Sequence, residues 1–539
     1  MILDSKSVQV NTHDMASHMD RVVVIGAGMG GLAAALRLAH AGFDVTLVEE
    51  GTPGGKMRTL PSVAGPVDAG PTVLTLKAVF DDLFAAAGTS LEAHLTLQPL
   101  PVLARHWWPD GSTLDLLADE QASGAAVRAF AGPKAEAEFH RFSRRAAALF
   151  TAFDAPVMQR ARPHLGGILA ATLRSPQILP WLLPGLTLSR ALSASFTDPR
   201  LRQLFGRYAT YVGGAPTRSP AVLALIWQAE ARGVWAVKGG MARLAATLTR
   251  LVEAAGATLL TGVAVRDITV RAGRVAGVTL ADGRSLPCAH VVHAGDPAAL
   301  AEGLLGPDAR RAVPQRAVQP RSHSAEVWAF AARPQGLPLA YHNVFFAADP
   351  RAEFDRIARG QTPDDPTLYL CAQDRATSPP AGPERFEIIL NAPALPKDTA
   401  APPDEMDLSR CRNRTFQTLS RFGLTFDTLP GGAALTGPPG FARMFRASQG
   451  ALYGISPHGL TATFRRPGAR TGIAGLYLAG GGVHPGAGIP MATLSGRHAA
   501  GAIMQDRALT RPWARTAMPG GMSTASATTD AMPSRSSPS

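Results

Sequence analysis

Three glycines and one glutamate near the N-terminus have the types and the spacing that bind a dinucleotide. Gly26, Gly28 and Gly31 occur in the order G-x-G-x-x-G, and Glu49 closes the next apolar run. The first glycine permits a tight turn, the second lets the backbone approach a pyrophosphate, and the third lets a helix pack closely on a strand. The N–H groups at the start of that helix favour the negative charge of phosphates. A carboxylate at Glu49 is placed to accept both hydroxyls of an adenosine ribose.

The residues around these glycines predict the strand, helix and strand that such a site requires. Residues 22–25 are branched and apolar, which is typical of a buried strand, and residues 45–48 repeat that character. The helix between them carries small apolar residues and ends at Gly42. This context carries the prediction, because a bare G-x-G-x-x-G also occurs by chance in a glycine-rich chain. An acidic residue after the second strand disfavours a ribose 2′-phosphate, which leaves FAD or NAD rather than NADP.

A second glycine-rich turn directly after that strand favours FAD. It contains Gly55 and the cations Lys56 and Arg58. A plain NAD-binding unit does not need this turn, whereas FAD leaves a second phosphate and a ribityl chain to be held. The alternative, an ordinary solvent-exposed loop, stays open at this point.

Two later segments return to the same pattern and predict a cofactor domain built from separated pieces. The first contains Val265, which we expect to press on the adenine. The second runs from a strand at 475–479 through Gly481 and Gly482 into a helix that starts at Met491. A glycine-rich passage from strand to helix turns helix N–H groups toward a ligand, here the flavin ring or the ribityl chain. The expected cofactor-binding segments are 21–95, 236–300 and 456–506.

Composition limits the class of protein and the kind of partner. The chain has 539 residues, of which 46% are hydrophobic and 17% charged, and this size predicts two intertwined globular domains. The net charge is +12, but lysine and arginine do not cluster with aromatic residues, so we expect no nucleic acid partner. An anionic membrane surface is the better supported partner, and a merely solvated basic surface is the alternative.

The cysteines and the N-terminus indicate a reducing compartment. Cys288, Cys371 and Cys411 are far apart and form neither a metal-binding spacing nor a disulfide framework. Residues 1–20 carry aspartates and lack an apolar core, so they predict a flexible extension rather than a signal peptide or a membrane span. We therefore expect a cytoplasmic protein without a bound metal, associated peripherally with the inner face of the membrane.

The region 96–235 is predicted to be helical and to contact substrate and membrane. Its most apolar stretch, 163–192, is interrupted by arginine and proline and therefore does not suit a membrane span. It suits helices lying on one leaflet, with an apolar set that dips into the lipid, namely Ile178, Leu179, Trp181, Leu182 and Leu183. The alternative is the buried core of a helical substrate domain. Residues 301–455 predict the sheet of a second domain, and residues 507–539 a disordered tail.

Together these pieces resemble the bacterial phytoene-desaturase family of FAD-dependent carotenoid desaturases, which are amine-oxidase-like flavoproteins. The resemblance extends from Arg21 to Gln505. Its most specific marks are Asp68–Thr72, Glu230 with Gly233–Trp235 and Gly239–Gly240, Leu476–Tyr477, His484–Gly488 and Ser495–Arg497. The stretches most similar to 1-hydroxycarotenoid 3,4-desaturases, of the methoxyneurosporene dehydrogenase type, are Gly240–Leu244 and Gly481–His484.

The resemblance implies an α/β fold of three parts. These are a Rossmann-like FAD-binding domain of the glutathione-reductase type, an α+β substrate domain and a helical membrane-contacting region. Many members of the wider superfamily place an acidic residue at the start of the third glycine segment, where this chain has Gly480, Gly481 and Gly482. Carotenoid desaturases share that absence, so backbone amides are the expected flavin contacts there.

The implied reaction introduces a double bond between C3 and C4 of an acyclic C40 carotenoid, expected to be 1-hydroxylated. Alkyl hydrogens are too weakly acidic to be removed first, so hydride loss from the allylic C4 to flavin N5 precedes loss of the C3 proton. Glu230 and His484 are candidate proton acceptors, with a structural role as the alternative for each. Oxygen or a membrane quinone is the expected electron acceptor, because the sequence offers no second nucleotide motif.

Other functions of the same fold stay open as alternatives. They are phytoene desaturation or another carotenoid oxidoreduction, a soluble FAD amine oxidase, and a non-catalytic lipid carrier. An amine oxidase would need an aromatic pair beside the flavin, and Tyr477 has no evident partner in the sequence. The complete set Gly26, Gly28, Gly31 and Glu49 favours a flavin enzyme over a lipid carrier.

Overall fold

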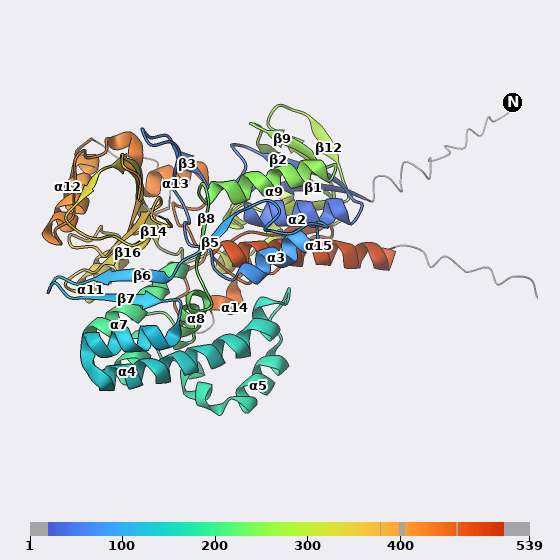
Figure 1. The fold of residues 1–539 in the computed structure, drawn as a ribbon. Coiled ribbons are helices and arrows are strands. Elements are labelled where there is room, and N and C mark those ends of the chain that lie inside the picture. The colour runs from blue at the N-terminus through green and yellow to red at the C-terminus, as the bar shows by residue number, and fades with distance from the viewer. Residues whose placement is uncertain (1–19, 378, 398–404, 460–461, 511–539) are drawn as a thin grey trace, which may run out of the picture.

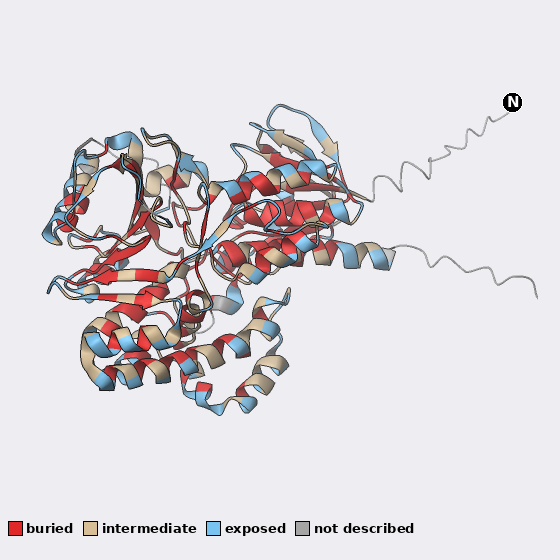
Figure 2. Cartoon of the chain, viewed as in Figure 1, coloured by how far each residue is buried: buried red, intermediate tan, exposed pale blue. Residues whose placement is uncertain are grey.

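Figure 1 shows the fold in a computed structural model that describes residues 20–377, 379–397, 405–459 and 462–510. A parallel sheet with its helices lies on the right, a second sheet lies on the left, and a group of helices lies below the second sheet. Buried residues follow the strands of both sheets (Figure 2). The predicted extension, except Asp20, and the predicted tail from residue 511 onward lie outside the described residues, while residues 507–510 continue the last helix.

A five-stranded parallel sheet forms the base of the cofactor half. Its strands are β1 (Arg21–Ile25), β2 (Asp44–Glu49), β9 (Thr258–Thr261), β13 (His290–His293) and β21 (Leu476–Leu478), in the order β21-β13-β1-β2-β9. Every neighbouring pair is parallel. The strands come from three distant parts of the chain, which confirms the predicted Rossmann-like fold built from discontinuous segments.

Alternate residues of β1 serve two different layers. Val22 and Val24 pack with the helices on one face, and Val23 packs with a three-stranded antiparallel sheet on the other. The helical layer contains α2 (Met29–His40), α3 (Lys77–Ala85), α9 (Ala242–Ala254) and α15 (Ile489–Thr510). The antiparallel sheet consists of β10 (Val265–Arg271), β11 (Arg274–Leu280) and β12 (Ser285–Pro287).

Helices α2 and α15 cross at glycines. A Cβ on Gly496 would lie 2.3 Å from the Gly30 carbonyl oxygen and 2.9 Å from the Ala33 Cβ. A Cβ on Gly30 would lie 2.5 Å from the backbone nitrogen of Gly480, at the end of β21. The crossing therefore brings the N-terminal and C-terminal cofactor segments into direct backbone contact.

A seven-stranded mixed sheet forms the second half. Its strands are β6 (Val102–Trp107), β7 (Thr113–Leu117), β14 (Ser324–Ala332), β16 (His342–Phe345), β17 (Leu368–Ala372), β18 (Glu384–Ala392) and β20 (Leu435–Thr436), in the order β20-β14-β18-β17-β16-β6-β7. Leu368 and Leu370 of β17 and Ile388 of β18 face α12 (Glu405–Arg421) through its Phe416 and Leu419. Residues one step along these strands face the opposite way. That opposite face meets the helical region.

The predicted helical region 96–235 is helical only from Glu120 onward. It begins with β5 (Leu97–Pro99), β6 and β7, and the last two belong to the seven-stranded sheet. Its helices are α4 (Glu120–Phe153), η1 (Asp154–Met158), α5 (Leu165–Arg174), η2 (Pro176–Leu182), α6 (Leu188–Ser195), α7 (Pro199–Gly206), η3 (Arg207–Val212), η4 (Ala221–Leu225) and α8 (Ile226–Ala231). The alternation of polar and apolar residues from Thr113 to Leu116 is the strand signal that the sequence prediction passed over.

Shorter elements complete the described chain. They are β3 (Thr59–Leu60), β4 (Val67–Asp68), β8 (Trp235–Val237), α10 (Ala298–Ala301), η5 (Asp308–Ala312), η6 (Gln315–Ala317), β15 (Pro334–Gln335), α11 (Pro350–Ala358), β19 (Thr425–Phe426), η7 (Gly432–Ala434), α13 (Pro438–Met444) and α14 (Ala462–Arg465). Among the described residues, no helix combines the length and the apolar character needed to cross a bilayer.

The leaflet prediction for 163–192 is wrong for two of its five residues. Ile178 and Trp181 are buried in the core of the helical region, where the Trp181 ring lies 6.1 Å from the Phe142 ring. These two side chains fix η2 on α4, so they are not available to lipid. Leu179 and Leu183 remain exposed.

The helix crossing gives a stability prediction. We expect Gly496→Ala to lower the free energy of unfolding by about 1–3 kcal/mol, because its Cβ would overlap backbone atoms of α2. Gly501→Ala on the same helix is the matched control, since a Cβ there meets nothing within 4 Å. That control should be neutral or stabilising by about 0.5–1 kcal/mol. Denaturant unfolding of both variants measures the difference, and equal responses would contradict the role given to the crossing.

Candidate active site

The glycine motif forms the turn between β1 and α2. Gly26 has a φ of +98°, which favours glycine, and a Cβ on Gly31 would lie 1.9 Å from the Gly26 carbonyl oxygen. Gly28 is the N-cap of α2 and offers no side chain to the N–H groups of the first turn. A Cβ on Gly28 would meet nothing within 4 Å. The start of α2 therefore presents backbone N–H groups to an open space that suits phosphate.

The second glycine turn packs directly on the first. The Gly54 N–H donates to the Ala27 carbonyl oxygen at 2.9 Å. A Cβ on Gly55, whose φ is +59°, would lie 3.2 Å from the Gly28 Cα. The structure thus brings Gly55 beside the phosphate turn, as the sequence predicted, and the two turns form one cradle.

Glu49 joins both turns through its two carboxylate oxygens. Oε2 accepts the Ala27 N–H at 2.7 Å, and Oε1 accepts the Gly51 N–H at 2.8 Å. The residue is only partly buried, so further lone pairs of the carboxylate are accessible to the hydroxyls of a ribose. Glu49 lies at the end of β2, in the position that the motif assigns to a ribose-binding acid.

The two cations of the second turn point to different neighbours. Lys56 donates to the Leu452 carbonyl oxygen, and burial lowers the pKa of its ammonium to about 8. Arg58 donates to Thr436 Oγ1 at 2.6 Å, and its guanidinium lies 5.9 Å from the centroid of the Phe441 ring. Arg58 is thus directed to the seven-stranded sheet and α13, away from the cradle in which the sequence prediction placed it.

The third glycine segment is held by a cation that the sequence analysis did not single out. Arg466 donates to the Gly481 carbonyl oxygen at 3.0 Å and to the Tyr453 carbonyl oxygen at 2.9 Å. Burial lowers the pKa of Arg466 to about 10, and the nearby Asp296 carboxylate opposes this shift. A Cβ on Gly482 would lie 2.7 Å from Pro297 Cδ. The backbone of this segment therefore packs directly against the proline ring.

Two further predicted contacts have clear positions. Met491 lies in the first turn of α15 and is partly buried. Val265 begins β10 and is buried in one core cluster with Val23 and Val48, the last of which precedes Glu49. Contact of Val265 with an adenine stays a prediction.

These residues fit FAD. Helices α2 and α15 follow the parallel strands β1 and β21, so both helices begin at the carboxyl edge of the same sheet, where α/β folds bind nucleotides. The cradle offers free N–H groups to phosphates and a carboxylate to ribose. The Gly480–Gly482 segment, in contact with Gly30, offers backbone groups to the rest of the cofactor.

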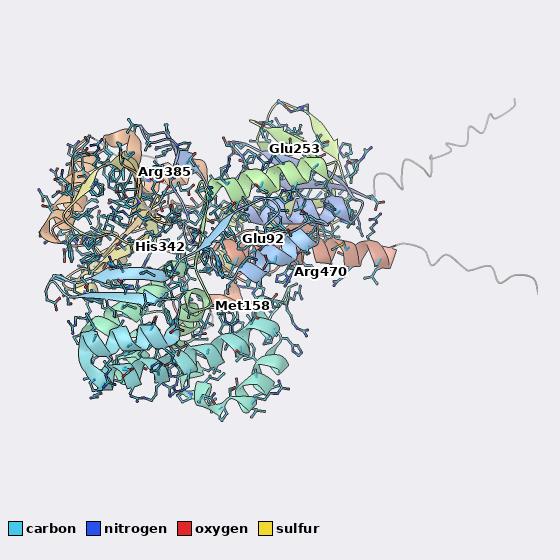
Figure 3. All side chains as sticks on the ribbon, in the orientation of Figure 1. Glu92, Met158, Glu253, His342, Arg385 and Arg470 are labelled. Atoms are coloured by element: carbon cyan, nitrogen blue, oxygen red, sulfur yellow. The ribbon has the colours of Figure 1, made fainter. Side chains whose placement is uncertain are left out.

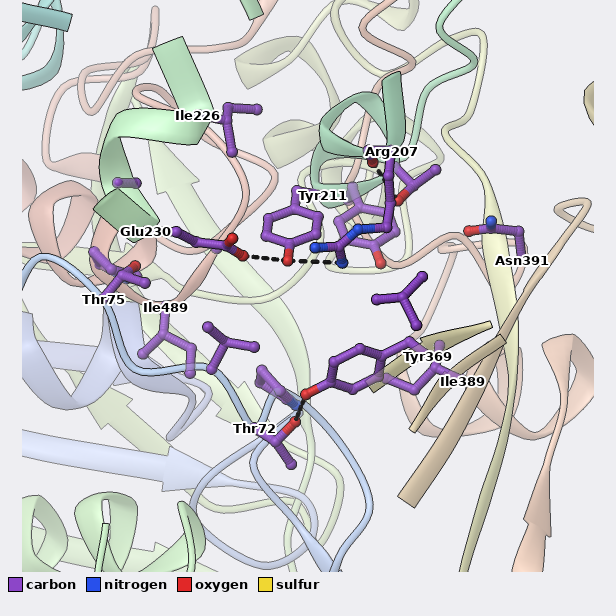
Figure 4. A pocket seen from close by; sticks show the side chains of 18 of the residues that line it. Thr72, Thr75, Arg207, Tyr211, Ile226, Glu230, Tyr369, Ile389, Asn391 and Ile489 are labelled. Carbon is purple, nitrogen blue, oxygen red and sulfur yellow. Dashed lines mark hydrogen bonds between the residues drawn. The ribbon is translucent and has the colours of Figure 1, made fainter. Parts of the chain in front are cut away.

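A cavity of about 240 Å³ lies between the sheet face opposite α12, the helical region and the start of α15 (Figure 4). Its apolar lining comprises Pro71, Val73, Ile226, Ala229, Val344, Ile389, Ile489 and Pro490. Its polar lining comprises Thr72, Thr75, Arg207, Thr210, Tyr211, Glu230, Thr367, Tyr369, Asn391 and Tyr453. A cavity whose surface is mainly apolar and carries polar groups is typical of a substrate site.

Glu230 is one of the lining residues and accepts hydrogen bonds from two tyrosines. The Tyr208 hydroxyl donates to Oε2 at 2.6 Å, and the Tyr211 hydroxyl donates to Oε1. Arg207 Nη1 donates to the Tyr211 hydroxyl oxygen at 2.9 Å. Figure 4 shows the resulting row from Arg207 through Tyr211 to Glu230 along one wall. The structure therefore places Glu230 at the cavity, as one of two candidate acid–base residues.

The facing wall contains a second row of polar groups. The Tyr369 hydroxyl lies 2.8 Å from Thr72 Oγ1 and 2.7 Å from His342 Nδ1. Burial lowers the pKa of His342, which is labelled in Figure 3, to about 3, so its ring is neutral. Thr72 also donates to Glu387 Oε2 at 3.3 Å, and burial raises the pKa of Glu387 well above its usual range. This wall therefore carries two hydroxyl groups, which are held by His342 and Glu387 outside the cavity lining.

His484, the other candidate proton acceptor, does not line the cavity. Its ring is buried, and Nε2 lies 2.9 Å from the Val157 carbonyl oxygen and 3.0 Å from the Arg160 carbonyl oxygen. A ring nitrogen between two carbonyl oxygens is a donor, so His484 ties the third glycine segment to η1. This geometry is the structural role named as the alternative for His484.

Several lining residues escaped the sequence analysis. Arg207 and Tyr211 are four apart, a spacing that brings side chains together on a helix, but nothing local distinguishes them from a surface pair. Tyr369 and Asn391 come from strands in which every second residue faces the cavity. Thr72 is the last residue of the motif Asp68–Thr72, but the sequence analysis assigned it no function.

Comparison with known proteins agrees with this geometry. A family model described as flavin containing amine oxidoreductase matches residues 29–329. Two solved oxidase structures share the fold at low identity. Putrescine oxidase has a TM-score of 0.57 at 15% identity, over 90% of this chain and 99% of that chain. Cyclohexylamine oxidase from Brevibacterium oxydans has a TM-score of 0.54 at 18% identity, over the same shares.

Three curated relatives, each named hydroxyneurosporene desaturase, match nearly the whole chain. The protein of Cereibacter sphaeroides is 59% identical over 92% of this chain and 99% of its own length, and that of Rhodobacter capsulatus is 54% identical over the same shares. The protein of Rubrivivax gelatinosus is 46% identical over 95% of this chain and 98% of its own length. The chain is therefore an FAD-dependent oxidoreductase that belongs to the flavin containing amine oxidoreductase family and, within it, to the bacterial carotenoid desaturases.

Proposed function

We propose that this desaturase forms the double bond between C3 and C4 of an acyclic C40 carotenoid that carries a hydroxyl group on C1. The names of the three relatives at 46–59% identity support a hydroxylated substrate. The structural observation that carries the proposal is the cavity itself, which combines apolar walls with polar groups, of which Thr72, Arg207 and Glu230 are buried. A pure hydrocarbon would need only the apolar walls.

The cavity's part in the reaction is to orient the end of the polyene and to exclude water. Bound FAD supplies the acceptor for the hydride that leaves C4. Val344 and Ile389 on the sheet and Ile226 on α8 surround the chain with carbon, which keeps water from the cation that the polyene then carries. Loss of the C3 proton needs only a weak base, and Glu230 is the candidate that lines the cavity.

The residues that hold FAD follow from the cradle. Glu49 would accept the ribose hydroxyls, and the first-turn N–H groups of α2 would bind the pyrophosphate. Lys56 and the backbone of Gly481 and Gly482 would contact the flavin end. Arg58 donates to Thr436 instead, so we assign it no cofactor contact.

The helical region would bind one face of a membrane. Four leucines of α5 and the η2 segment are exposed, namely Leu169, Leu173, Leu179 and Leu183, with exposed fractions of 55–73%. The exposed arginines of this stretch, Arg162, Arg174 and Arg190, suit anionic headgroups. A water-insoluble substrate would enter from the lipid, and oxygen or a membrane quinone would accept the electrons. We therefore propose that the protein lies at the cytoplasmic face of the membrane.

The role of Glu49 predicts loss of flavin. We expect Glu49→Arg to weaken FAD binding by about 100-fold or more, because the ribose and the N–H groups of Ala27 and Gly51 lose a charged acceptor. The ratio of flavin to protein absorbance in the purified protein measures this. Glu50→Arg is the matched control, since Glu50 is exposed and pairs with Arg446 on the surface. If the purified Glu49→Arg protein were still yellow with bound flavin, Glu49 would not be the residue that holds the ribose.

The proposed reaction predicts a preference between substrates. Flavin-loaded protein is incubated with liposomes that contain either a 1-hydroxylated acyclic carotenoid or phytoene, and absorption spectra are followed. We expect the enzyme to desaturate the hydroxylated carotenoid but not phytoene, so only the absorption of the hydroxylated carotenoid shifts to longer wavelength. Deuterium at C4 should slow the reaction more than deuterium at C3, because hydride loss comes first. Turnover of phytoene alone, or an isotope effect only at C3, would reject the proposal.

The leucine surface predicts membrane binding. We expect the double variant Leu173→Asp with Leu179→Asp to reduce binding to anionic vesicles by about tenfold or more, because two apolar side chains no longer leave water. Vesicle flotation measures the bound fraction. Val63→Asp is the control, since Val63 is even more exposed than the two leucines but lies in the loop between β3 and β4. Equal binding of both variants would show that the leucines do not contact lipid.

A further inference from the structure

The cavity of this desaturase contains a buried cation that hydride and proton transfer do not use. Arg207 lies at the start of η3, lines the cavity and is 8% exposed. Its guanidinium lies 5.5 Å from the centroid of the Tyr208 ring and 5.0 Å from that of the Tyr211 ring. The centroids of the two rings lie only 5.3 Å from each other, so both rings lie to one side of the guanidinium and leave its other side to further partners.

The donors of Arg207 are not all used. Arginine has five N–H groups, of which Nη1 bonds the Tyr211 hydroxyl oxygen at 2.9 Å. Nε is enclosed by protein, whereas Nη2 is not among the enclosed atoms and makes no hydrogen bond to the described residues. The N–H donors of Nη2 are therefore available to a ligand in the cavity.

Glu230 balances the charge of Arg207 through Tyr211. The Tyr211 hydroxyl accepts from Arg207 and donates to Glu230, and the carboxylate also accepts from Tyr208. The row is therefore neutral as a whole, which suits a cavity where a cation must form on the polyene. Burying two charged side chains is costly compared with burying apolar residues of the same volume, so a hydrocarbon substrate alone gives no reason for them.

We propose that Arg207 is a specificity-determining residue that donates a hydrogen bond to the C1 hydroxyl oxygen of the substrate. The inference rests on the proposed function, because only three bonds of about 1.5 Å separate C1 from C4. The hydroxyl must then lie in the same cavity as the reacting carbons. Among the residues that line this cavity, Arg207 is the one with a cationic side chain, and its Nη2 donors have no partner among the described residues.

The wild-type enzyme provides the first test. Flavin-loaded protein in liposomes is given a 1-hydroxylated acyclic carotenoid or the same molecule with hydrogen in place of the hydroxyl. We expect kcat/KM to be about 100-fold or more lower for the second substrate, because the Nη2 donor is then left unpaired. Equal values would overturn the inference while leaving the desaturase function in place. Turnover of neither substrate would overturn the proposed function and the inference with it.

Variants of Arg207 and Tyr211 test whether Arg207 is the residue that discriminates between the two substrates. We expect Arg207→Lys, which keeps the charge but loses the planar set of donors, to reduce the discrimination ratio at least about tenfold. Tyr211→Phe, which removes the hydroxyl that orients the guanidinium, should reduce it as well, and it is the second route if Arg207→Lys does not fold. Arg375→Lys is the matched control, because Arg375 is a largely buried arginine paired with Glu384 away from the cavity. An unchanged ratio in the folded variants of Arg207 and Tyr211 would overturn the assignment.

Discussion

Direct backbone contact between remote segments is the constraint on which the cofactor half depends. At Gly30 and Gly496 an added Cβ would lie 2.5 and 2.3 Å from backbone atoms of the other segment, and at Gly31 it would lie 1.9 Å from the Gly26 carbonyl oxygen in the same turn. Because α2 and α15 begin at the same edge of the parallel sheet, this contact brings two helix N-termini toward one space. Glu49 then ties the first two turns together. The geometry that suits FAD is therefore a consequence of missing side chains as much as of present ones.

The cofactor half could be predicted from sequence because its signals are local. Gly26, Gly28, Gly31 and Glu49 lie within one strand–helix–strand unit, and their spacing reports the turn and the helix start directly. Gly55 follows from the same unit, since its turn continues from β2. Arg58 shows the limit of this reasoning. Its type suits a phosphate, but Thr436 and Phe441, far along the chain, attract the side chain to the other sheet.

The substrate half was harder to predict, because the residues that line its cavity depend on how the strands pair in register. Tyr369 and Asn391 line the cavity only because β17 and β18 pair so that one face of each strand turns away from α12. Burial divides the 163–192 stretch in a similar way, with Ile178 and Trp181 inward and Leu179 and Leu183 outward. Hydrophobicity alone does not distinguish these directions. The strands β6 and β7, ahead of α4, were hidden by the helical pattern that follows them.

The parallel sheet also has a consequence for the life of the polypeptide. Its strand β21 and helix α15 come from residues 476–510, whereas the G-x-G-x-x-G turn is complete by residue 31. During translation the G-x-G-x-x-G turn emerges early, but the segment against which Gly30 packs emerges only once residue 480 has been made. Cofactor capture is thus a late event in biogenesis. A premature stop codon ahead of α15 should yield an apoprotein even though its nucleotide-binding fingerprint is intact.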